Sequence, residues 1–316
     1  MAGRRSARRV IETANTTTTT LAHLSDPHLA HDGLRLPVGA LMNKRIMSQW
    51  SWRRRRRFLH VDAILERVAA DVRDAAPDAV ALTGDLTNLG LPVECRHAAA
   101  WLRKNMPEPT FVVPGNHDML VRESWPDSVG QWAAWMAAAP DDFPYVRHVG
   151  SVALIGVNSA RPMPWFTAAG RIGAAQADRL ADILHETGRA GAFRVVMIHH
   201  PPVDGMVPRR KALLDSGLFR SVIGRAGAEM VLHGHAHLSA VSTLPGPAMS
   251  VPVLGIASAS MRAHRQERMA AWHHIRVTTT DRGFHAEIHR RIVGLDQPVR
   301  ALPPWSFDVY RVPRPI

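Results

Sequence analysis

The feature that most constrains the fold is an alternation of short apolar runs with segments of helical period. The runs are too short for helices and are bounded by turn residues, so they predict buried strands at residues 17–24, 78–82, 110–113, 193–198 and 229–232. Between them, apolar side chains recur three and four residues apart, as Ile64, Leu65 and Val68 do. This pattern predicts helices at 59–76, 92–105, 174–186 and 211–225, with a Trp-rich helix at 124–138.

The remaining segments favour sequential strands. A hairpin is predicted at 145–157, turning at Gly150-Ser151, and residues 239–293 alternate apolar and polar side chains between turns. Strand–helix units followed by sequential strands indicate an α/β fold with two packed sheets flanked by helices.

Length and composition favour one large domain. With 316 residues and 46% hydrophobic residues, the chain can bury a sizeable core, which we expect at 19–297. We expect a basic, Thr-rich leader at 1–18, a basic insertion at about 31–58 and a proline-rich tail at 298–316, with no regular structure in the leader or the tail. No apolar run has the length of a membrane-spanning helix, and the leader lacks the apolar region of a secretory signal.

The single cysteine and the net charge limit location and partners. Cys95 has no partner for an intramolecular disulfide, which fits a reducing cytoplasm, and we interpret it as a small core residue. The formal net charge of +12 favours anionic partners, which include nucleic acid, anionic lipid and phosphorylated substrates.

Five of the predicted strands end in blocks of metal-binding residue types. The blocks are Asp26-Pro27-His28, Gly84-Asp85, Gly115-Asn116-His117-Asp118, His199-His200 and Gly234-His235-Ala236-His237. Singly, each is also typical of a turn, a cap or a surface histidine, but the five together favour a site at the carboxyl ends of the strands. Carboxylate, imidazole and amide groups suit Mn, Fe or Zn, and this many ligands favour two metals with a bridging carboxylate.

In order and content, these five blocks resemble the calcineurin-like metallophosphoesterases. The blocks HHPP and GDLTNLG are most similar to the bacterial branch that contains class III cyclic-nucleotide phosphodiesterases. The resemblance implies a four-layer αββα sandwich, two divalent transition metals and hydrolysis of phosphoric esters.

The resemblance also implies a role for each matching residue. Asp26, His28 and His237 would hold one metal, Asn116, His199 and His235 the other, and Asp85 would bridge them. A hydroxide between the metals would be the nucleophile, and His117 would act as the general acid on the leaving oxygen.

The sequence allows more than one role for four residues that neighbour the predicted ligands. Asp118 either orients a site histidine or caps a following helix, and the cap is favoured. Many relatives carry an acid where this chain has Asn88, so the orientation of His117 must be achieved differently here or lost. His200 is either substrate-facing or structural, and His233 is interpreted as a supporting neighbour. His60 and the other histidines outside the blocks are interpreted as surface or core residues.

The insertion has three interpretations. Met42, Ile46, Met47 and Trp50 lie at helical spacing, and five consecutive arginines, 53–57, follow. The segment can be a packed helix with a solvated basic face, a membrane-surface helix through residues 40–57, or a nucleic-acid patch with stacked tryptophans. Because it follows the first metal block, we expect it near the mouth of the site.

The leading hypothesis is therefore a phosphodiesterase with two metals that acts on a phosphorylated small molecule. A cytoplasmic enzyme on the inner membrane face that hydrolyses a nucleotide-linked lipid pyrophosphate, and a nuclease, are alternatives for the substrate. A metal-binding scaffold without activity is the alternative class.

Overall fold

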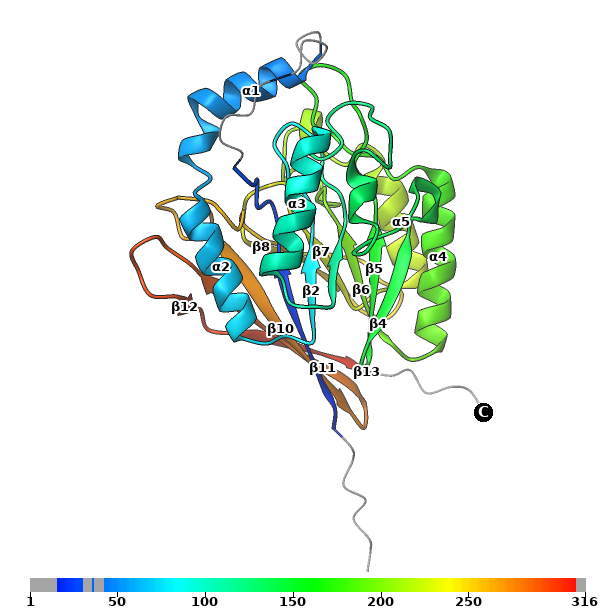
Figure 1. Ribbon diagram of the computed structural model, residues 1–316. Helices are drawn as coiled ribbons and strands as arrows, with labels where there is room; N and C mark the ends of the chain where they lie inside the picture. Colours follow the sequence, from blue (N-terminus) through cyan, green and yellow to red (C-terminus); the bar gives the residue numbers. More distant parts are fainter. Residues whose placement is uncertain (1–15, 31–35, 37–42, 311–316) are drawn as a thin grey trace, which may run out of the picture.

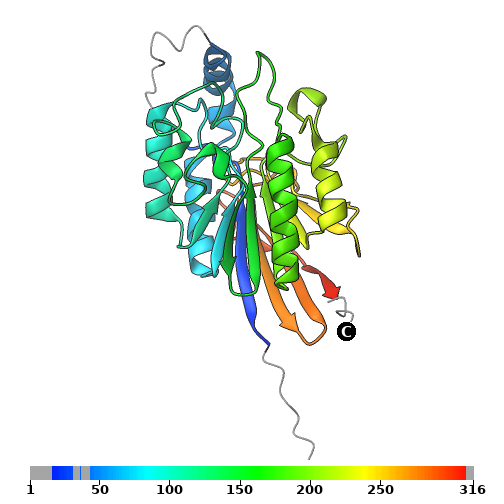
Figure 2. The same ribbon diagram turned by 90° about the vertical axis from the view of Figure 1, so that its right-hand side faces the viewer.

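The structure is a computed structural model that describes residues 16–30, 36 and 43–310. Most of the predicted leader, Met42 and several other residues of the insertion, and the last six residues of the tail lie outside the described residues. The described residues form two mixed β-sheets that pack face to face, with helices on both outer faces (Figures 1 and 2). The predicted four-layer αββα fold is confirmed.

The first sheet carries three of the five blocks. Its strand order is β12-β11-β10-β1-β2-β3, and β13 also pairs with β11. The parallel trio β1, β2 and β3 forms its centre and one edge. The bounds are β1 Thr18–Leu24, β2 Ala79–Leu82, β3 Thr110–Val112, β10 Ala271–Thr280, β11 Gly283–Ile292, β12 Arg300–Ala301 and β13 Trp305–Tyr310.

The second sheet carries the other two blocks and has the order β4-β5-β6-β7-β9-β8. Strands β5, β6, β7 and β9 are parallel, and an antiparallel strand closes each edge. The bounds are β4 Tyr145–Val149, β5 Val152–Val157, β6 Phe193–Ile198, β7 Met230–His233, β8 Ala240–Leu244 and β9 Val251–Gly255.

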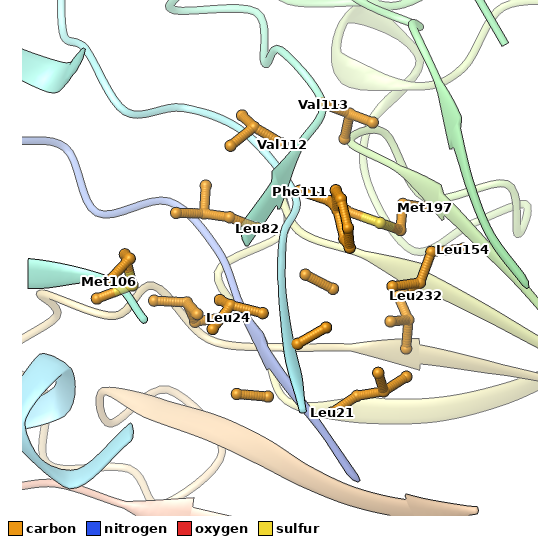
Figure 3. Close-up of a cluster of buried hydrophobic side chains, with 14 of the residues drawn as sticks. Leu21, Leu24, Leu82, Met106, Phe111, Val112, Val113, Leu154, Met197 and Leu232 are labelled. Carbon is orange, nitrogen blue, oxygen red and sulfur yellow. The ribbon is translucent and has the colours of Figure 1, made fainter. Parts of the chain in front are cut away.

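Apolar side chains fill both kinds of interface. Between the sheets, Leu82 and Phe111 from the first sheet lie in one buried cluster with Leu154, Met197 and Leu232 from the second (Figure 3). The longer helices bury their apolar stripes on the outer faces, as the three-and-four spacing predicts. Helices α2 (Asp62–Asp74) and α3 (Pro92–Asn105) cover the first sheet, and α4 (Ala174–Arg189) and α5 (Ser216–Ala226) the second.

The insertion forms α1 (Arg45–Arg54) and a short 3₁₀ helix η2 (Arg56–Phe58). In both ribbon views α1 lies at the end of the molecule where the metal blocks follow their strands. The Arg45 guanidinium fixes the start of α1, donating to the carbonyls of Leu89 and Gly90 at 2.8 and 2.5 Å and pairing with Glu123 at 2.6 Å. In the described part of the chain, no helix is long and apolar enough to cross a bilayer.

Two predictions of local structure are wrong. The Trp-rich segment 124–138 contains only a 3₁₀ helix, η3 (Val129–Trp132). Its indoles each have a different acceptor: Trp132 donates to the Cys95 carbonyl at 2.9 Å and Trp135 to the Glu108 carboxylate at 2.8 Å. The tail was expected to lack regular structure, but β13 pairs with β11 in register from Gly283↔Tyr310 to Ile288↔Trp305. An edge strand of this kind alternates in exposure and is hidden in the sequence by its flanking prolines. Two further 3₁₀ helices are η4 (Pro140–Asp142) and η5 (Arg209–Lys211).

Candidate metal centre

The five blocks converge, but they come from both sheets rather than from one sheet edge. Three follow β1, β2 and β3, and two follow β6 and β7. The loops are joined directly: the Asp26 amide donates to the Gly84 carbonyl at 2.9 Å and the Gly234 amide to the His199 carbonyl at 3.1 Å. Gly234 permits the loop after β7 to approach the loop after β1, because a Cβ there would lie 1.8 Å from Ser25 Oγ and 2.4 Å from Asp26 Oδ2. The site therefore straddles the junction between the two sheets.

One group of side chains gathers around His28. His237 Nε2 lies 3.1 Å from Asp26 Oδ1 and 3.3 Å from His28 Nε2, and His28 Nε2 lies 3.9 Å from the same Asp26 oxygen. Asp26 and His28 are buried. Burial, helped by Arg56, holds the pKa of His28 well below its ordinary value, so the ring is neutral, as a metal ligand must be.

A second group gathers around His199. Its Nε2 lies 3.2 Å from Asn116 Oδ1, and its ring centroid lies 5.0 Å from that of His235. His235 Nε2 is buried without a hydrogen-bond partner among the described residues. A buried imidazole nitrogen with a free acceptor position is costly unless a ligand completes it. Burial, then the neighbouring His200 and His199, keep the pKa of His235 well below its ordinary value.

Asp85 lies between the two groups. Its Oδ2 is 3.8 Å from His28 Nε2 and 3.4 Å from His199 Nε2, while Oδ1 accepts the His117 amide at 2.7 Å. Burial opposes ionisation, but His199 and His117 hold the pKa of Asp85 well below its ordinary value. Burial disfavours the charged form of His199, but the neighbouring Asp85 carboxylate raises the pKa of His199 to about 9.

The backbone supports the same set of residues. Of the seven non-glycine residues with positive φ in the described chain, five are predicted ligands: Asp26 (53°), His28 (44°), Asp85 (55°), His235 (63°) and His237 (47°). Each such conformation costs about 1–3 kcal/mol and persists at functional sites because the surroundings impose it. Strained backbone, the lowered pKa values of His28 and His235 and the unpartnered His235 nitrogen fit a site for two divalent transition ions.

His117 faces the same space from the other side. Its Nδ1–H donates to the Asn88 carbonyl at 2.7 Å, because that oxygen can only accept, and the other ring nitrogen, Nε2, lies 3.2 Å from an Arg56 nitrogen. Burial and the nearby Arg56 guanidinium lower the pKa of His117 to about 3. The orientation expected from an acid at position 88 is thus supplied by the Asn88 backbone. The side chain of Asn88 instead donates to the Leu29 carbonyl at 2.8 Å.

The prediction that Asp118 caps a helix is wrong, because turns follow it directly and the next described helix, η3, begins only at Val129. Its buried carboxylate accepts the amides of Asp85, Gly115 and Thr87, each at 2.8 Å. Burial and the Asp85 carboxylate raise the pKa of Asp118 to about 7. Asp118 thus joins the loop that carries Asp85 to the loop that carries Asn116.

His200 and His233 are held by the protein. His200 Nδ1 is 2.8 Å from Ser159 Oγ and its Nε2 is 3.2 Å from the Ala168 carbonyl, so both ring nitrogens are engaged. His233 Nδ1–H donates to the Gly234 carbonyl at 3.0 Å. His233 Nε2, like His235 Nε2, is buried without a hydrogen-bond partner among the described residues, but it lies against Gly255 and His233 does not line the pocket over the site.

Two residues of the site escape the sequence analysis. His60 is buried with its ring centroid 4.4 Å from that of His28, and its Nδ1 lies 2.8 Å from Ser260 Oγ. Arg56 reaches in from η2, with nitrogens 2.9 Å from His28 Nδ1 and 3.2 Å from His117 Nε2. No pattern distinguishes Arg56 within five consecutive arginines, and His60 lies outside the five blocks, so only the fold reveals them.

A pocket of about 300 Å³ opens over this centre. Asp85, Asn116, His117, His235 and His237 form its floor, and Met47, Phe166 and Leu120 contribute apolar surface. Four cationic side chains line it: Lys44, Arg56, Arg210 and Lys211. The pocket combines metal-ligating groups with positive charge, an arrangement suited to a phosphate group.

Comparisons with known proteins agree with this geometry. The calcineurin-like phosphoesterase family matches residues 19–239, and the chain belongs to that family. A probable cyclic nucleotide phosphodiesterase of Synechococcus sp. is 26% identical over 226 residues, which cover 70% of this chain and 80% of that protein. The chain is a hydrolase that acts on phosphoric esters.

Solved structures show the same fold at low identity. A dimetal phosphatase from Danio rerio is 10% identical, with a TM-score of 0.59 over 91% of this chain and 98% of that one. A purple acid phosphatase from yellow lupin seeds is also 10% identical, with a TM-score of 0.53 over 92% of this chain and 53% of that one.

Proposed function

We propose that the chain is a phosphodiesterase dependent on two divalent metals. The observation that carries the proposal is the position of Asp85 Oδ2 between the two groups of predicted ligands. This oxygen lies 3.8 Å from His28 Nε2 and 3.4 Å from His199 Nε2, and Asp85 lines the cationic pocket. Asp26, His28 and His237 would hold one ion, Asn116, His199 and His235 the other, with Asp85 shared. When bound, Mn, Fe or Zn supplies Lewis acidity and lowers the pKa of a coordinated water.

Protein side chains would bind the phosphate group and protonate the leaving oxygen. Arg56 can bind a non-bridging phosphate oxygen, since a guanidinium donates along two directions at once. His117, fixed through Nδ1 by the Asn88 carbonyl, presents Nε2 toward the pocket and, once protonated, can give that proton to the leaving oxygen. An anionic phosphate between Arg56 and His117 would raise the pKa of His117 toward the working range.

Activity on a generic diester tests the proposal. Protein loaded with Mn is expected to hydrolyse bis(4-nitrophenyl) phosphate, and Asp85→Asn is expected to abolish turnover while the circular dichroism spectrum stays unchanged. Inactivity of protein that holds two equivalents of Mn, Fe or Zn would instead favour the scaffold alternative. The exposed Asp127→Asn serves as a matched control.

The substrate head group is decided by a panel. The Synechococcus relative supports diester chemistry, and the panel compares cyclic nucleotides, a nucleotide-linked lipid pyrophosphate and nucleic acid on the same metal-loaded preparation. Nucleic acid as substrate predicts affinity that falls steeply with salt. The single cysteine, buried Cys95, favours a reducing compartment such as the cytoplasm.

A further inference from the structure

Exposed apolar side chains are concentrated in two segments that each contribute a residue to the pocket. Nine large hydrophobic residues are exposed in the described chain, and six of them lie in just two segments. These are Ile46, Met47, Trp50 and Phe58 in α1–η2, and Trp165 and Phe166 in the loop after β5, from 39% exposed for Ile46 to 73% for Phe166. Contiguous exposed apolar surface of this kind marks an interaction site more often than scattered residues do. We call these six residues the apolar rim.

The two segments of the apolar rim form one surface. Lys44 Nζ donates to the carbonyls of Met163 and Thr167 at 3.0 and 3.1 Å, which ties the start of α1 to the loop after β5. Met47 from α1 and Phe166 from the loop both line the pocket over the metal centre. Phe166 is held with a positive φ of 62°, a conformation uncommon for a bulky residue.

Positive charge surrounds the apolar rim. Arg53, Arg54, Arg55 and Arg57 are exposed, and none of the ion pairs between described residues includes them. Arg54 lies over the Trp50 ring at 4.8 Å and Arg57 over the Phe58 ring at 4.6 Å. Aromatic rings beside unpaired arginines are the composition of helices that lie in the interface of an anionic bilayer.

We propose that the apolar rim docks the enzyme on an anionic lipid bilayer, so that the pocket receives a phosphodiester carried by an acyl or polyprenyl chain. Ile46 and Met47 favour lipid over nucleic acid, because aliphatic side chains cannot stack on bases. One face of the Trp50 and Phe58 rings is already covered by a guanidinium, which further reduces base stacking. The docking stands independently, whereas the lipid-borne substrate rests on the proposed function.

Sedimentation with vesicles tests the docking. The full chain is expected to bind phosphatidylcholine vesicles that contain phosphatidylserine, and more weakly those without it. The variant Trp50→Ser/Phe58→Ser/Trp165→Ser should reduce binding by at least about tenfold. A control variant, Val241→Ser/Tyr310→Ser, removes exposed apolar residues outside the apolar rim and should leave binding unchanged. Equal binding of the rim variant and the wild type would overturn the proposal, as would rim-dependent binding of RNA without binding of vesicles.

A paired activity assay separates this inference from the proposed function. None of the three rim substitutions lies among the pocket residues, so turnover of soluble bis(4-nitrophenyl) phosphate should not change. Hydrolysis of hexadecyl 4-nitrophenyl phosphate in phosphatidylserine vesicles should fall about as much as binding does. Vesicle binding without any diesterase activity would refute the proposed function and leave the docking standing. Equal loss of both activities would refute the docking role.

Discussion

The carboxylate of Asp118 accepts the backbone N–H of Asp85 at 2.8 Å and, through the same oxygen, that of Gly115 at 2.8 Å. The loops after β2 and β3 are therefore held by one buried side chain that does not itself face the pocket. The position of Asp85 Oδ2 between the two ligand groups depends on this bond, which makes Asp118 a positioning residue.

Asp118→Asn should weaken metal binding more than it weakens the fold. An amide replaces one accepting oxygen with a donor, so either the Thr87 amide or the Asp85 and Gly115 amides lose their partner. Substitution of a residue that orients metal ligands typically lowers metal affinity about 10–100-fold, and we expect a loss in that range for Mn. Isothermal titration with Mn measures it. An unchanged affinity in a variant that folds normally would show that the loops are held without Asp118.

The charge state of His199 predicts how metal binding depends on pH. Without metal, Asp85 raises the pKa of His199 to about 9, so the ring is protonated below that pH and must lose its proton to bind an ion. Metal affinity should therefore rise with pH up to about 9 and then level off. Titrations at equal ionic strength in buffers of different ionisation enthalpy count the released protons. Release of no proton at pH 7 would contradict the assigned charge.

His117 should affect turnover without affecting metal content. His117→Gln is expected to retain the metal and to lower kcat by about 10²–10⁴-fold, the usual contribution of a general acid. A parallel loss of metal would instead identify His117 as a ligand.

The pH profile provides a second test of the same role. A general acid must be protonated, so kcat falls as pH rises through the pKa of His117 in the substrate complex. The like charge of Arg56 lowers that pKa, and Arg56→Ala should therefore shift the alkaline limb to higher pH. An alkaline limb at the same pH in Arg56→Ala would show that Arg56 does not lower the pKa of His117.

Arg54, the last residue of α1, and Arg56, the first residue of η2, form a matched pair in the insertion. Arg54 is exposed and lies over Trp50, whereas Arg56 lies in the pocket. Inhibition by orthovanadate should weaken about 10–100-fold in Arg56→Ala, corresponding to a lost charge-assisted hydrogen bond, and should not change in Arg54→Ala. Equal effects would mean that only the summed charge of the insertion matters.

The metal blocks were predictable because each combines a strand end with an uncommon residue order. Strand ends are readable from apolar runs, and helix α3 was predicted at both of its ends because Pro92 begins it. The structure brings the seven predicted ligands together, with His60 and His200 beside them, and their assignment to two metals stays a prediction.

The rest depended on contacts that local sequence does not encode. Arg56 enters the site only because Arg45 anchors α1 to the Leu89 and Gly90 carbonyls. His60 faces His28 only because Ser260 binds its other nitrogen, 200 residues away. Strand β13 could not be predicted without knowing that β11 offers a free edge for pairing. In the Trp-rich segment, the expected helix is replaced by separate contacts of the indole rings.

The insertion between β1 and β2 contributes Lys44, Met47 and Arg56 to the pocket from one continuous segment, apart from the metal ligands and from His117. It is held near its start by Lys44 and Arg45, and just beyond its end the Val61 amide donates to the Ser260 carbonyl at 2.9 Å. Between these points, Arg56 contacts His28 and His117. If Arg56 is kept, α1 can be exchanged for a segment of different length and polarity while the metal ligands and His117 stay on their own loops. The metal ligands and much of the surface that surrounds the substrate therefore lie in different parts of the chain. Grafting this segment into a relative would be a way to redirect substrate specificity.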